Sequence, residues 1–438
     1  MQSFSTFIPP ERTLMGPGPS DVNPRILNAM ARPTLGHLDP LFIELMDQTK
    51  QLLQYAFKTE NALTMPISAP GSAGMEACFV NLVEPGDKVL VCINGVFGNR
   101  MVENVERCGG EAITVNNTWG EQTDLNVVED TLKANPDIKI LAFVHAETST
   151  GVRNEAKALC ELAKKYDCLS IVDAVTSLGG IELDVDGWSI DAIYSGSQKC
   201  LSCVPGISPV SFSERAVNVI QNRETKVQSW FLDMNLIVGY WGQGAKRAYH
   251  HTAPVNSMYA MYEALLILKE EGLENAWQRH ALGHEKLAQG ISELGLELTV
   301  DSAYRLPQLN VVKIPDGGKF TCGTGDDLEI EHTGSGSFIR TSASSSGDLA
   351  IEARNGADLY LSAADDVFIR PQGSENGIKV IGNGATELYY DNSKMFETTS
   401  TGALVSRSSG DVSLSVGDTS NSDGHLILTA KSSSLEIH

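Results

Sequence analysis

The chain has 438 residues, a net charge of −22 and 42 % hydrophobic residues, which is enough for two or three packed domains. The excess of carboxylates argues against nucleic acid and anionic membranes as partners, because binding to them needs clustered Lys and Arg. The N-terminus lacks the basic and apolar regions of a signal peptide, and no apolar run approaches the roughly 18 residues of a membrane span. We therefore expect a globular, cytoplasmic protein.

A change in composition divides the chain near residue 317. Residues 318–438 hold 8 Lys and Arg against 17 Asp and Glu, together with 20 Ser, 10 Thr and 15 Gly but no Trp. Seven of the eight cysteines precede this segment at irregular spacings, in a chain large enough to fold without disulfides. We expect two unlike pieces, and free thiols in a reducing cytosol.

The first piece predicts helices and strands in alternation. Helical spacing of apolar residues over 39–57, with Asp39 as N-cap and Pro40 at the first position, indicates one helix. Further apolar and amphipathic runs predict helices over 71–83 and 155–167, strands over 88–92 and 191–194, and buried strands over 112–115, 138–145 and 168–174. Short apolar strands separated by helices indicate an α/β fold with a mostly parallel sheet and helices on both faces.

Ligands of such folds bind outside the carboxyl ends of the strands, and four of these ends carry small or polar residues. Residues 68–74 open a helix, which suits a phosphate but is equally typical of a plain helix start. Asp173 ends an apolar strand and is either a helix cap or a catalytic carboxylate. Lys199 follows a run of small residues, where a lysine is usually a solvated chain end. Residues 144–151 form a hydroxyl-rich turn, which by itself is an ordinary loop.

One cofactor, pyridoxal phosphate (PLP), would use all four groups together. It needs a lysine amine for covalent attachment, a carboxylate at its pyridine nitrogen and a cup for its phosphate. The carboxylate keeps the ring nitrogen protonated, so that the ring can accept electrons when the substrate Cα loses its proton. The released amine of Lys199 is the natural base for that proton. The spacing from Asp173 to Lys199 leaves room for one crossover between neighbouring strands.

Seven blocks of the first piece follow one another in a fixed order. They are Gly-Pro-Gly-Pro (16–19), Asn-Gly-Val-Phe-Gly (94–98), Glu-Thr-Ser-Thr-Gly-Val (147–152), Val-Asp (172–173), Ser-Gly-Ser-Gln-Lys (195–199), Tyr-His-His-Thr (249–252) and Glu-Gly-Leu-Glu-Asn (271–275). With these blocks the chain resembles the class V aminotransferases, most closely the alanine-glyoxylate and serine-pyruvate aminotransferase branch. The resemblance implies a PLP-transferase type I fold, with a large domain over 1–255 and an incomplete small domain over 256–317.

The resemblance also implies roles for single residues. Lys199 is expected to bind the cofactor covalently, Asp173 to pair with its pyridine nitrogen, and Phe97 to stack on its ring. Thr148 is expected to reach the phenolic oxygen of the cofactor. The remaining cofactor-binding residues are expected to be Gly71, Ser72, Val175 and Gln198, with Tyr249 and Thr252 reaching the phosphate of the neighbouring subunit. An obligate homodimer follows from this last expectation.

Four residues bear on how far the resemblance extends. Pro70 stands where the family usually has serine, which removes a hydroxyl and an N–H from the phosphate cup, although Ser72 can partly substitute. Gln198 stands where the related cysteine desulfurases usually have histidine, which favours transamination. Cys200 and Cys203 are compatible with redox chemistry or zinc, but without a second pair we expect a core or lining role and no metal site.

The resemblance stops near Gly317. Members of the family continue with residues that complete the small domain and supply, in an Arg-Ile-Gly stretch, the arginine that binds the substrate carboxylate. Arginine is the side chain best suited to this bidentate contact. Arg340 and Arg370 stand in unrelated sequence contexts, so neither is expected to replace it.

Residues 318–438 show short alternating runs every 8 to 13 residues, separated by Gly, Ser, Asn and Asp. The pattern predicts an all-β, repetitive or solenoid-like tail, and a disordered linker is the alternative. Strands are expected over 349–353, 358–363, 366–370, 377–381, 387–391, 411–416 and 425–430. Residues 387–402 resemble repeats of phage tail-fibre and virion proteins, which implies a fusion whose tail favours trimers.

The leading hypothesis is a PLP-dependent aminotransferase that transfers an amino group from alanine or serine to glyoxylate or pyruvate. The missing carboxylate-binding arginine is expected to impair this activity. The alternative is a fibre-like structural or adhesive protein of the virion that carries an inactive aminotransferase fragment. A third hypothesis keeps the cofactor but changes the reaction, for example to phosphonate-linked transamination.

Overall fold

The computed structural model describes residues 5–10, 12–242, 247–314, 319–322, 328–332, 337–341, 349, 351, 358, 361, 363, 365–371 and 375–406. By its internal contacts the chain forms two compact units, residues 1–320 with 331–338 and residues 321–330 with 339–438. The boundaries expected after residues 255 and 317 stay predictions.

The first unit is a central sheet surrounded by helices. Its helices are α1 (Pro24–Met30), α2 (Pro40–Phe57), α3 (Gly71–Leu82), α4 (Val96–Arg107), α5 (Leu125–Ala134), α6 (Ala156–Lys165), α7 (Glu214–Gln221), α8 (Met234–Trp241), α9 (Val255–Glu271) and α10 (Leu273–Glu293). Its strands are β1 (Leu63–Ile67), β2 (Lys88–Ile93), β3 (Glu111–Asn116), β4 (Ile138–Val144), β5 (Ala146–Glu147), β6 (Val152–Arg153), β7 (Leu169–Asp173), β8 (Ala192–Tyr194), β9 (Ser208–Phe212), β10 (Glu297–Leu298) and β11 (Val312–Lys313).

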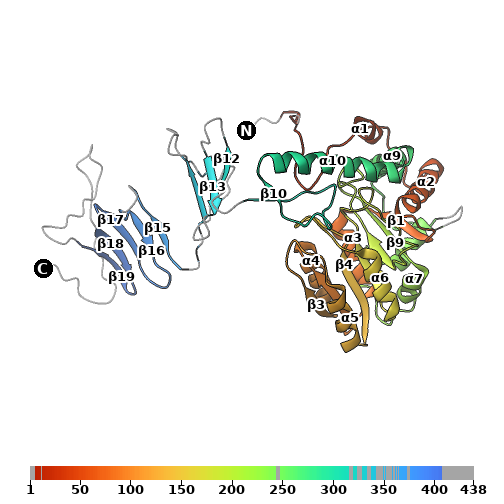
Figure 1. Ribbon diagram of the computed structural model, residues 1–438, viewed down its shortest axis with the longest axis horizontal. Coiled ribbons are helices and arrows are strands. Elements are labelled where there is room, and N and C mark those ends of the chain that lie inside the picture. Colours follow the sequence, from red (N-terminus) through yellow and green to blue (C-terminus); the bar gives the residue numbers. More distant parts are fainter. Residues whose placement is uncertain are drawn as a thin grey trace, which may run out of the picture. The chain divides into compact units, whose positions relative to one another are not determined.

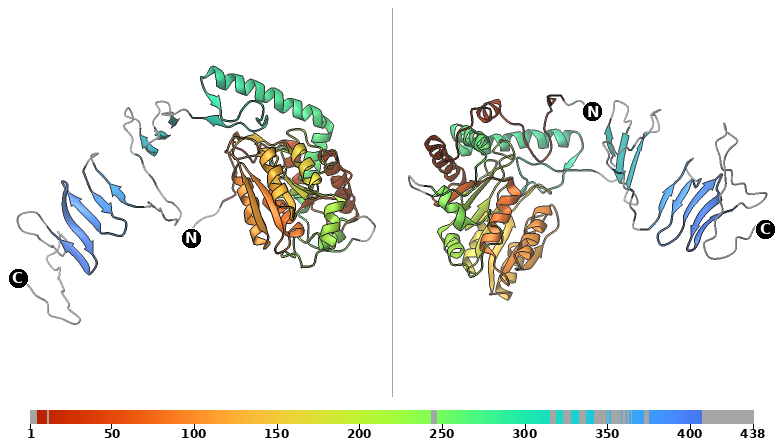
Figure 2. Two further views of the ribbon diagram at one scale, coloured as in Figure 1. Left: turned by 60° about the horizontal axis from the view of Figure 1, so that its bottom comes forward. Right: turned by 180° about the vertical axis from the view of Figure 1, so that it is seen from behind.

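Seven of these strands form the central sheet in the order β1-β9-β8-β7-β4-β2-β3. The neighbours from β8 to β3 pair in parallel, whereas β9 is antiparallel to both β1 and β8. Helices lie on both faces of the sheet (Figure 1 and Figure 2). The predicted α/β fold with a mostly parallel sheet is therefore confirmed.

The expected helices and strands of this unit agree with the structure to within two residues at their ends. The helix α2 begins as predicted, because the Asp39 side chain accepts a hydrogen bond from the Leu41 N–H at 2.9 Å and Pro40 occupies the first position. The expectation that residues 112–115 are buried is wrong, since only Val115 of β3 is buried. The reason is that β3 lies at one edge of the sheet, pairs only with β2 and is not covered as β1 is, the other edge strand, which is buried throughout.

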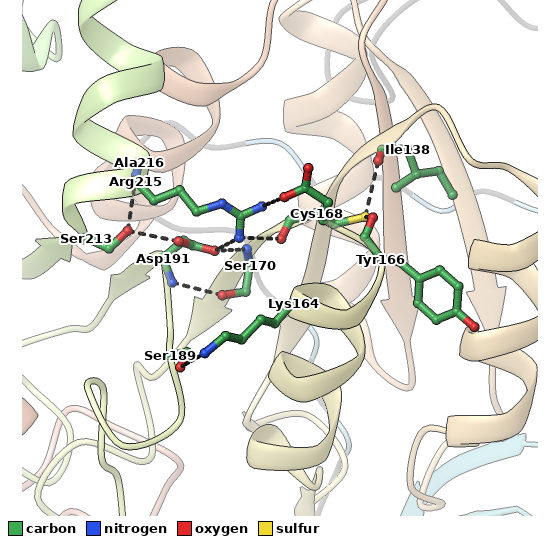
Figure 3. Close-up of polar contacts among 11 residues, drawn as sticks. Ile138, Lys164, Tyr166, Cys168, Ser170, Ser189, Asp191, Ser213, Arg215 and Ala216 are labelled. Carbon is green, nitrogen blue, oxygen red and sulfur yellow. Dashed lines mark hydrogen bonds and ion pairs between the residues drawn. The ribbon is translucent and has the colours of Figure 1, made fainter.

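A polar network ties the N-terminal ends of β7 and β8 to α7 (Figure 3). The buried Asp191 carboxylate accepts hydrogen bonds from the Ser170 N–H at 3.0 Å and from the Ser213 hydroxyl at 2.9 Å. The Arg215 guanidinium donates to Asp191 at 3.3 Å and to the Cys168 carbonyl at 3.0 Å. Burial raises the pKa of Asp191, while these hydrogen bonds and the Arg215 charge favour its ionised form. The network thus stabilises the end of the sheet opposite the carboxyl ends of β7 and β8.

Arg215→Met is expected to lower the free energy of unfolding by roughly 1–3 kcal/mol, because Asp191 would remain buried without its cation. Urea unfolding followed by circular dichroism at pH 7 measures this change. Arg107→Met is the matched control, since its ion pair with Glu103 lies on an exposed helix surface and should contribute less than about 0.5 kcal/mol. Equal losses in the two variants would contradict the role given to Arg215.

Residues 297–313 return from α10 to the carboxyl ends of the sheet strands. The Leu306 N–H donates to the Gly151 carbonyl at 3.2 Å. The Gln308 side chain donates to the Thr176 carbonyl at 2.8 Å. This segment therefore holds the loops that follow β4 and β7.

The remaining strands form two smaller sheets. One consists of β12 (Lys319–Cys322), β13 (Leu328–His332) and β14 (Ser337–Thr341), and the other is an antiparallel meander of β15 (Val367–Ile369), β16 (Ile378–Val380), β17 (Thr386–Tyr390), β18 (Ser393–Thr399) and β19 (Gly402–Val405). The strands expected over 366–370, 377–381 and 387–391 are confirmed. Those expected over 349–353 and 358–363 lie largely, and those over 411–416 and 425–430 entirely, outside the described residues. The solenoid-like arrangement, the tail-fibre resemblance and the trimer stay predictions.

In the described part of the chain, no helix is both long and apolar enough to span a membrane. The cysteines of the first unit are free thiols, and all of them except Cys200 are buried. The Cys200 thiol donates to the Thr176 carbonyl at 3.4 Å, and Cys203 is part of the main hydrophobic core. No group of three or more His, Cys, Asp or Glu side chains suited to a metal ion is found among the residues that the structure describes.

Candidate cofactor-binding site

The predicted site residues lie in loops and helix starts at the carboxyl ends of the parallel strands. Asp173 is the last residue of β7, and Lys199 follows β8, which is the parallel neighbour of β7. Thr148 lies in the turn after β4, and Phe97 lies in the first turn of α4, which follows β2. Because parallel strands end at the same edge of a sheet, these loops come together. The predicted crossover between neighbouring strands from Asp173 to Lys199 is confirmed.

The Asp173 carboxylate is buried without an ion-pair partner among the described residues. It accepts hydrogen bonds from the Val175 N–H at 2.8 Å and from the Tyr194 hydroxyl at 2.7 Å. Burial raises the pKa of Asp173 to about 7, although both hydrogen bonds favour the charged form. Residues 175–180 form turns and no helix, so the helix-cap alternative for Asp173 is wrong. A protonated ring nitrogen would supply the cation that this carboxylate lacks.

The Lys199 amine contacts the N-terminal segment of the chain. Its Nζ donates to the Pro17 carbonyl at 2.5 Å, and a Cβ at Gly18 would lie 2.7 Å from Nζ. With φ of +127° and this close approach, position 18 requires glycine. The side chain is half-buried, and burial lowers the pKa of the amine. A larger fraction of the amine is then neutral, and only the neutral amine can attack a carbonyl or accept a proton.

Gly71, Val175 and Gln198 lie close together around Gly196. A Cβ at Gly71 would lie 3.5 Å from the Gly196 Cα and 3.5 Å from Val175 Cγ2. A Cβ at Gly196 would lie 3.4 Å from Val175 Cγ1 and 2.9 Å from Gln198 Oε1. Gln198 Oε1 is buried and has no hydrogen-bond partner within the described residues. The structure thus brings three predicted cofactor residues together and leaves an unpaired polar atom among them.

The first turn of α3 presents free hydrogen-bond donors. Its N-cap is Pro70, which makes no side-chain cap, and the N–H groups of Gly71 and Ser72 find no acceptor in the described part of the chain. The Arg100 guanidinium lies 3.4 Å from the Ser72 hydroxyl and forms no ion pair with any described carboxylate. Free N–H groups, the helix dipole and a guanidinium together favour an anion such as a phosphate.

Phe97 and Thr148 belong to the same cluster of side chains. The Arg100 guanidinium that reaches Ser72 also lies over the half-buried Phe97 ring, 4.9 Å from its centroid. The Thr148 hydroxyl shares a hydrogen bond of 2.5 Å with the hydroxyl of Thr176, the residue after Val175. An aromatic face, a hydroxyl, a carboxylate, an amine and an anion cup therefore converge, and they match the parts of PLP in kind.

Tyr249 and Thr252 are not brought into this cluster by the structure. The Tyr249 side chain is 62 % exposed, and its ring lies 5.2 Å from that of His37. Thr252 is also exposed. His251, which lies between them, shares a hydrogen bond of 2.7 Å with Ser68, just before α3. The expected contact of Tyr249 and Thr252 with a neighbouring subunit stays a prediction.

Sequence reasoning missed Tyr194 and Arg100. In the sequence, Tyr194 is one residue of an apolar strand. The strands that contain Tyr194 and Asp173 are parallel neighbours and both end in the site, and their register places the two residues opposite each other. Arg100 follows Phe97 by three residues, and residues three apart share one face of a helix. The spacing of Arg100 from Phe97 is local, whereas the contact of Tyr194 with Asp173 follows only from the strand order.

Comparison with known proteins identifies relatives that cover most of this chain. Residues 25–318 match the family model described as "Aminotransferase class-V". Alanine–glyoxylate aminotransferase of Oryctolagus cuniculus is 42 % identical over 308 residues, which are 70 % of this chain and 78 % of that protein. (S)-Ureidoglycine–glyoxylate transaminase of Bacillus subtilis is 37 % identical over 327 residues, and the match covers 70 % of this chain and 78 % of that protein.

A solved structure agrees with these matches. The crystal structure of alanine–glyoxylate aminotransferase from Nostoc sp. superimposes with a TM-score of 0.70 at 47 % sequence identity. The superposition covers 72 % of this chain and 83 % of that one. Together with the family match over residues 25–318, this similarity shows that the chain belongs to the class V aminotransferases and is a PLP-dependent transaminase.

Proposed function

We propose that the chain transfers an amino group from a small amino acid, such as alanine or serine, to a small 2-oxo acid, such as glyoxylate or pyruvate. The observation that carries the proposal is the arrangement of two groups at neighbouring strands. A buried Asp173, without an ion-pair partner among the described residues, ends β7, and a half-buried Lys199 lies in the loop after β8. The two relatives at 42 % and 37 % identity are a glyoxylate aminotransferase and a glyoxylate transaminase, which supports glyoxylate as the amino acceptor.

Each residue of the cluster has a task in this proposal. PLP, when bound, supplies a carbonyl that reacts with amines and a ring that accepts electrons. Lys199 would hold the cofactor covalently and move a proton at the substrate Cα, and Asp173 would keep the ring nitrogen protonated. The phosphate would be bound by Gly71, Ser72, Gln198 and Arg100, the ring by Phe97 and Val175, and the phenolic oxygen by Thr148.

We also propose a cytoplasmic homodimer. The free thiols support a reducing compartment, and the exposure of Tyr249 and Thr252 leaves both available to a second subunit. A sizing column that records mass and visible absorbance tests this proposal. A dimer that carries bound PLP is expected, whereas a colourless trimer would favour the structural-protein alternative.

The function is tested with the purified full-length chain, PLP, alanine and glyoxylate, by measuring pyruvate formation. We expect turnover with a high KM for alanine, since residues 25–318 account for the family match and the expected carboxylate-binding arginine lies beyond the matched part of the family. Serine, (S)-ureidoglycine and an aminophosphonate serve as alternative amino donors. Failure of the wild type to bind PLP covalently would contradict the proposal. A higher kcat/KM for the aminophosphonate than for alanine would show that the amino donor is an aminophosphonate and not a small amino acid.

Tyr194→Phe is expected to raise the pKa of Asp173, because the hydroxyl of Tyr194 stabilises the charged carboxylate from 2.7 Å. A hydrogen bond to a charged group contributes roughly 1.5 kcal/mol, which corresponds to about one pH unit. The ionised carboxylate is the form that holds a protonated ring nitrogen, so PLP binding should begin to weaken at a pH about one unit higher than in the wild type. Titration of the apo-protein with PLP between pH 6 and 9 measures this shift.

The control for this prediction is Tyr166→Phe. Its hydroxyl donates to Glu129 at 2.9 Å, on the helical surface between α5 and α6 and away from Asp173. The pH profile of PLP binding should stay that of the wild type in this variant. An unchanged profile in Tyr194→Phe would show that its hydroxyl does not act on Asp173.

A further inference from the structure

Glu147 is a fully buried carboxylate beside the site, and one of its oxygens is unpaired. Its Oε1 accepts two hydrogen bonds from Ser149, from the N–H at 3.0 Å and from the hydroxyl at 2.6 Å. Its Oε2 has no hydrogen-bond partner in the part of the chain that the structure describes. An unsatisfied buried polar group costs roughly 1–3 kcal/mol. The Glu147 carboxylate therefore destabilises the fold relative to an apolar side chain, which indicates that it has a function in the site.

The turn between β2 and α4 packs directly against this carboxylate. A Cβ at Gly95 would lie 2.3 Å from Glu147 Cδ and 2.5 Å from the Ser149 hydroxyl oxygen. Gly95 has an extended backbone with φ of 174°, so glycine is required here for space and not for its backbone conformation. The position of Glu147 and Ser149 therefore limits where α4 can begin.

Ser149 also supplies the cap of α4. The N-cap residue Gly95 has no side chain to offer, and the N–H of Val96, the first residue of the helix, donates to the Ser149 hydroxyl at 3.0 Å. The first N–H groups of a helix need acceptors from outside the helix. Ser149 provides one across 53 positions of the sequence and thereby joins the β5–β6 turn to the start of α4.

We propose that Glu147 and Ser149 are positioning residues for Phe97, the aromatic ring next to Val96. Glu147 orients the Ser149 hydroxyl, Ser149 holds the first N–H of α4, and the start of the helix sets the place of the ring against the pyridine ring of PLP. Thr148 lies between the two residues, so the same turn also fixes the hydroxyl that shares a hydrogen bond with Thr176. The proposal rests on the function proposed above.

A double-mutant cycle on PLP affinity tests the proposal. The dissociation constant of PLP is measured with the full-length apo-protein for the wild type, Ser149→Ala, Phe97→Leu and the double variant. Ser149→Ala should weaken binding about fivefold, which corresponds to one hydrogen bond. In the Phe97→Leu background, Ser149→Ala should change the dissociation constant of PLP by less than about twofold. The effects of two substitutions that remove the same contact do not add.

Three further variants separate positioning from general stability. Glu147→Gln keeps an acceptor for Ser149 and should bind PLP within about twofold of the wild type, whereas Glu147→Met should match Ser149→Ala. Thr150→Val removes a hydroxyl of the same turn whose partner among the described residues is the Asn94 carbonyl, at 3.3 Å, and should leave PLP affinity unchanged. Thermal unfolding of each apo-protein confirms that it is folded.

The outcomes are distinct. Loss of PLP affinity in Ser149→Ala that disappears in the Phe97→Leu background supports the proposal. An unchanged affinity in Ser149→Ala, or the same fivefold loss in both backgrounds, overturns it while leaving the proposed function intact. A wild-type protein that does not bind PLP overturns both.

Discussion

Lys199→Ala is expected to abolish covalent binding of PLP and to lower kcat for alanine and glyoxylate by roughly 10⁴-fold or more, since attachment and proton transfer both depend on one amine. The structure gives that amine a half-buried place with a lowered pKa beside Asp173. Borohydride reduction of the wild type followed by peptide mass mapping should find the cofactor on the peptide that contains Lys199.

Lys157→Ala is the control for this substitution, because Lys157 is exposed on α6. It should retain the activity, the visible absorbance of bound PLP and the modified peptide of the wild type. Covalently bound PLP in Lys199→Ala, on any other lysine, would assign the catalytic amine to that residue instead.

Asp173→Asn is expected to raise the dissociation constant of PLP at least tenfold and to lower kcat by roughly 10²–10³-fold, because a neutral amide cannot hold the ring nitrogen protonated. Apo-protein titration and steady-state kinetics at pH 8 measure the two effects. Asp130→Asn, on the exposed surface of α5, should change neither.

The same substitution should stabilise the apo-protein. The pKa of Asp173 is about 7 in the folded chain, above the value near 3.9 of an unfolded one, so the folded state binds the proton more tightly. The stability that this proton contributes is present below pH 4 and is lost as the pH rises through 7. Asp173→Asn cannot ionise and should gain up to about 4 kcal/mol at pH 8, with no gain near pH 4. A loss of stability at pH 8 would contradict the burial of an unpaired charge.

Much of the first unit could be predicted from the sequence because its signals are local. The apolar runs of β2, β4 and β7 and the capped start of α2 follow from neighbouring residues alone. The exposure of β3 could not be predicted in this way, since it depends on the strand order that places β3 at an edge of the sheet and on what covers that edge.

The site residues that could be predicted from the sequence are polar residues that follow an apolar strand directly or after a few small residues. Asp173 after an apolar strand and Lys199 after small residues were visible in the sequence. The structure places Asp173 at the end of β7 and Lys199 in the loop that follows the adjacent strand β8. The contact of Tyr194 with Asp173 and that of Arg100 with Ser72 depend on the register of two strands and on the packing of α3 against α4. Neither arrangement has a signal within a short stretch of sequence.

The sequence by itself determined the alternation of helices and strands, the chemistry available at the strand ends and the change of composition near residue 317, because each is a property of consecutive residues. Only the tertiary structure decided which polar atoms of the site are paired. Ser149 caps a helix that begins 53 positions earlier, and Gly95 leaves the space that the Glu147 carboxylate fills. Such contacts depend on distances between loops from different strands, and these distances exist only once the sheet has formed.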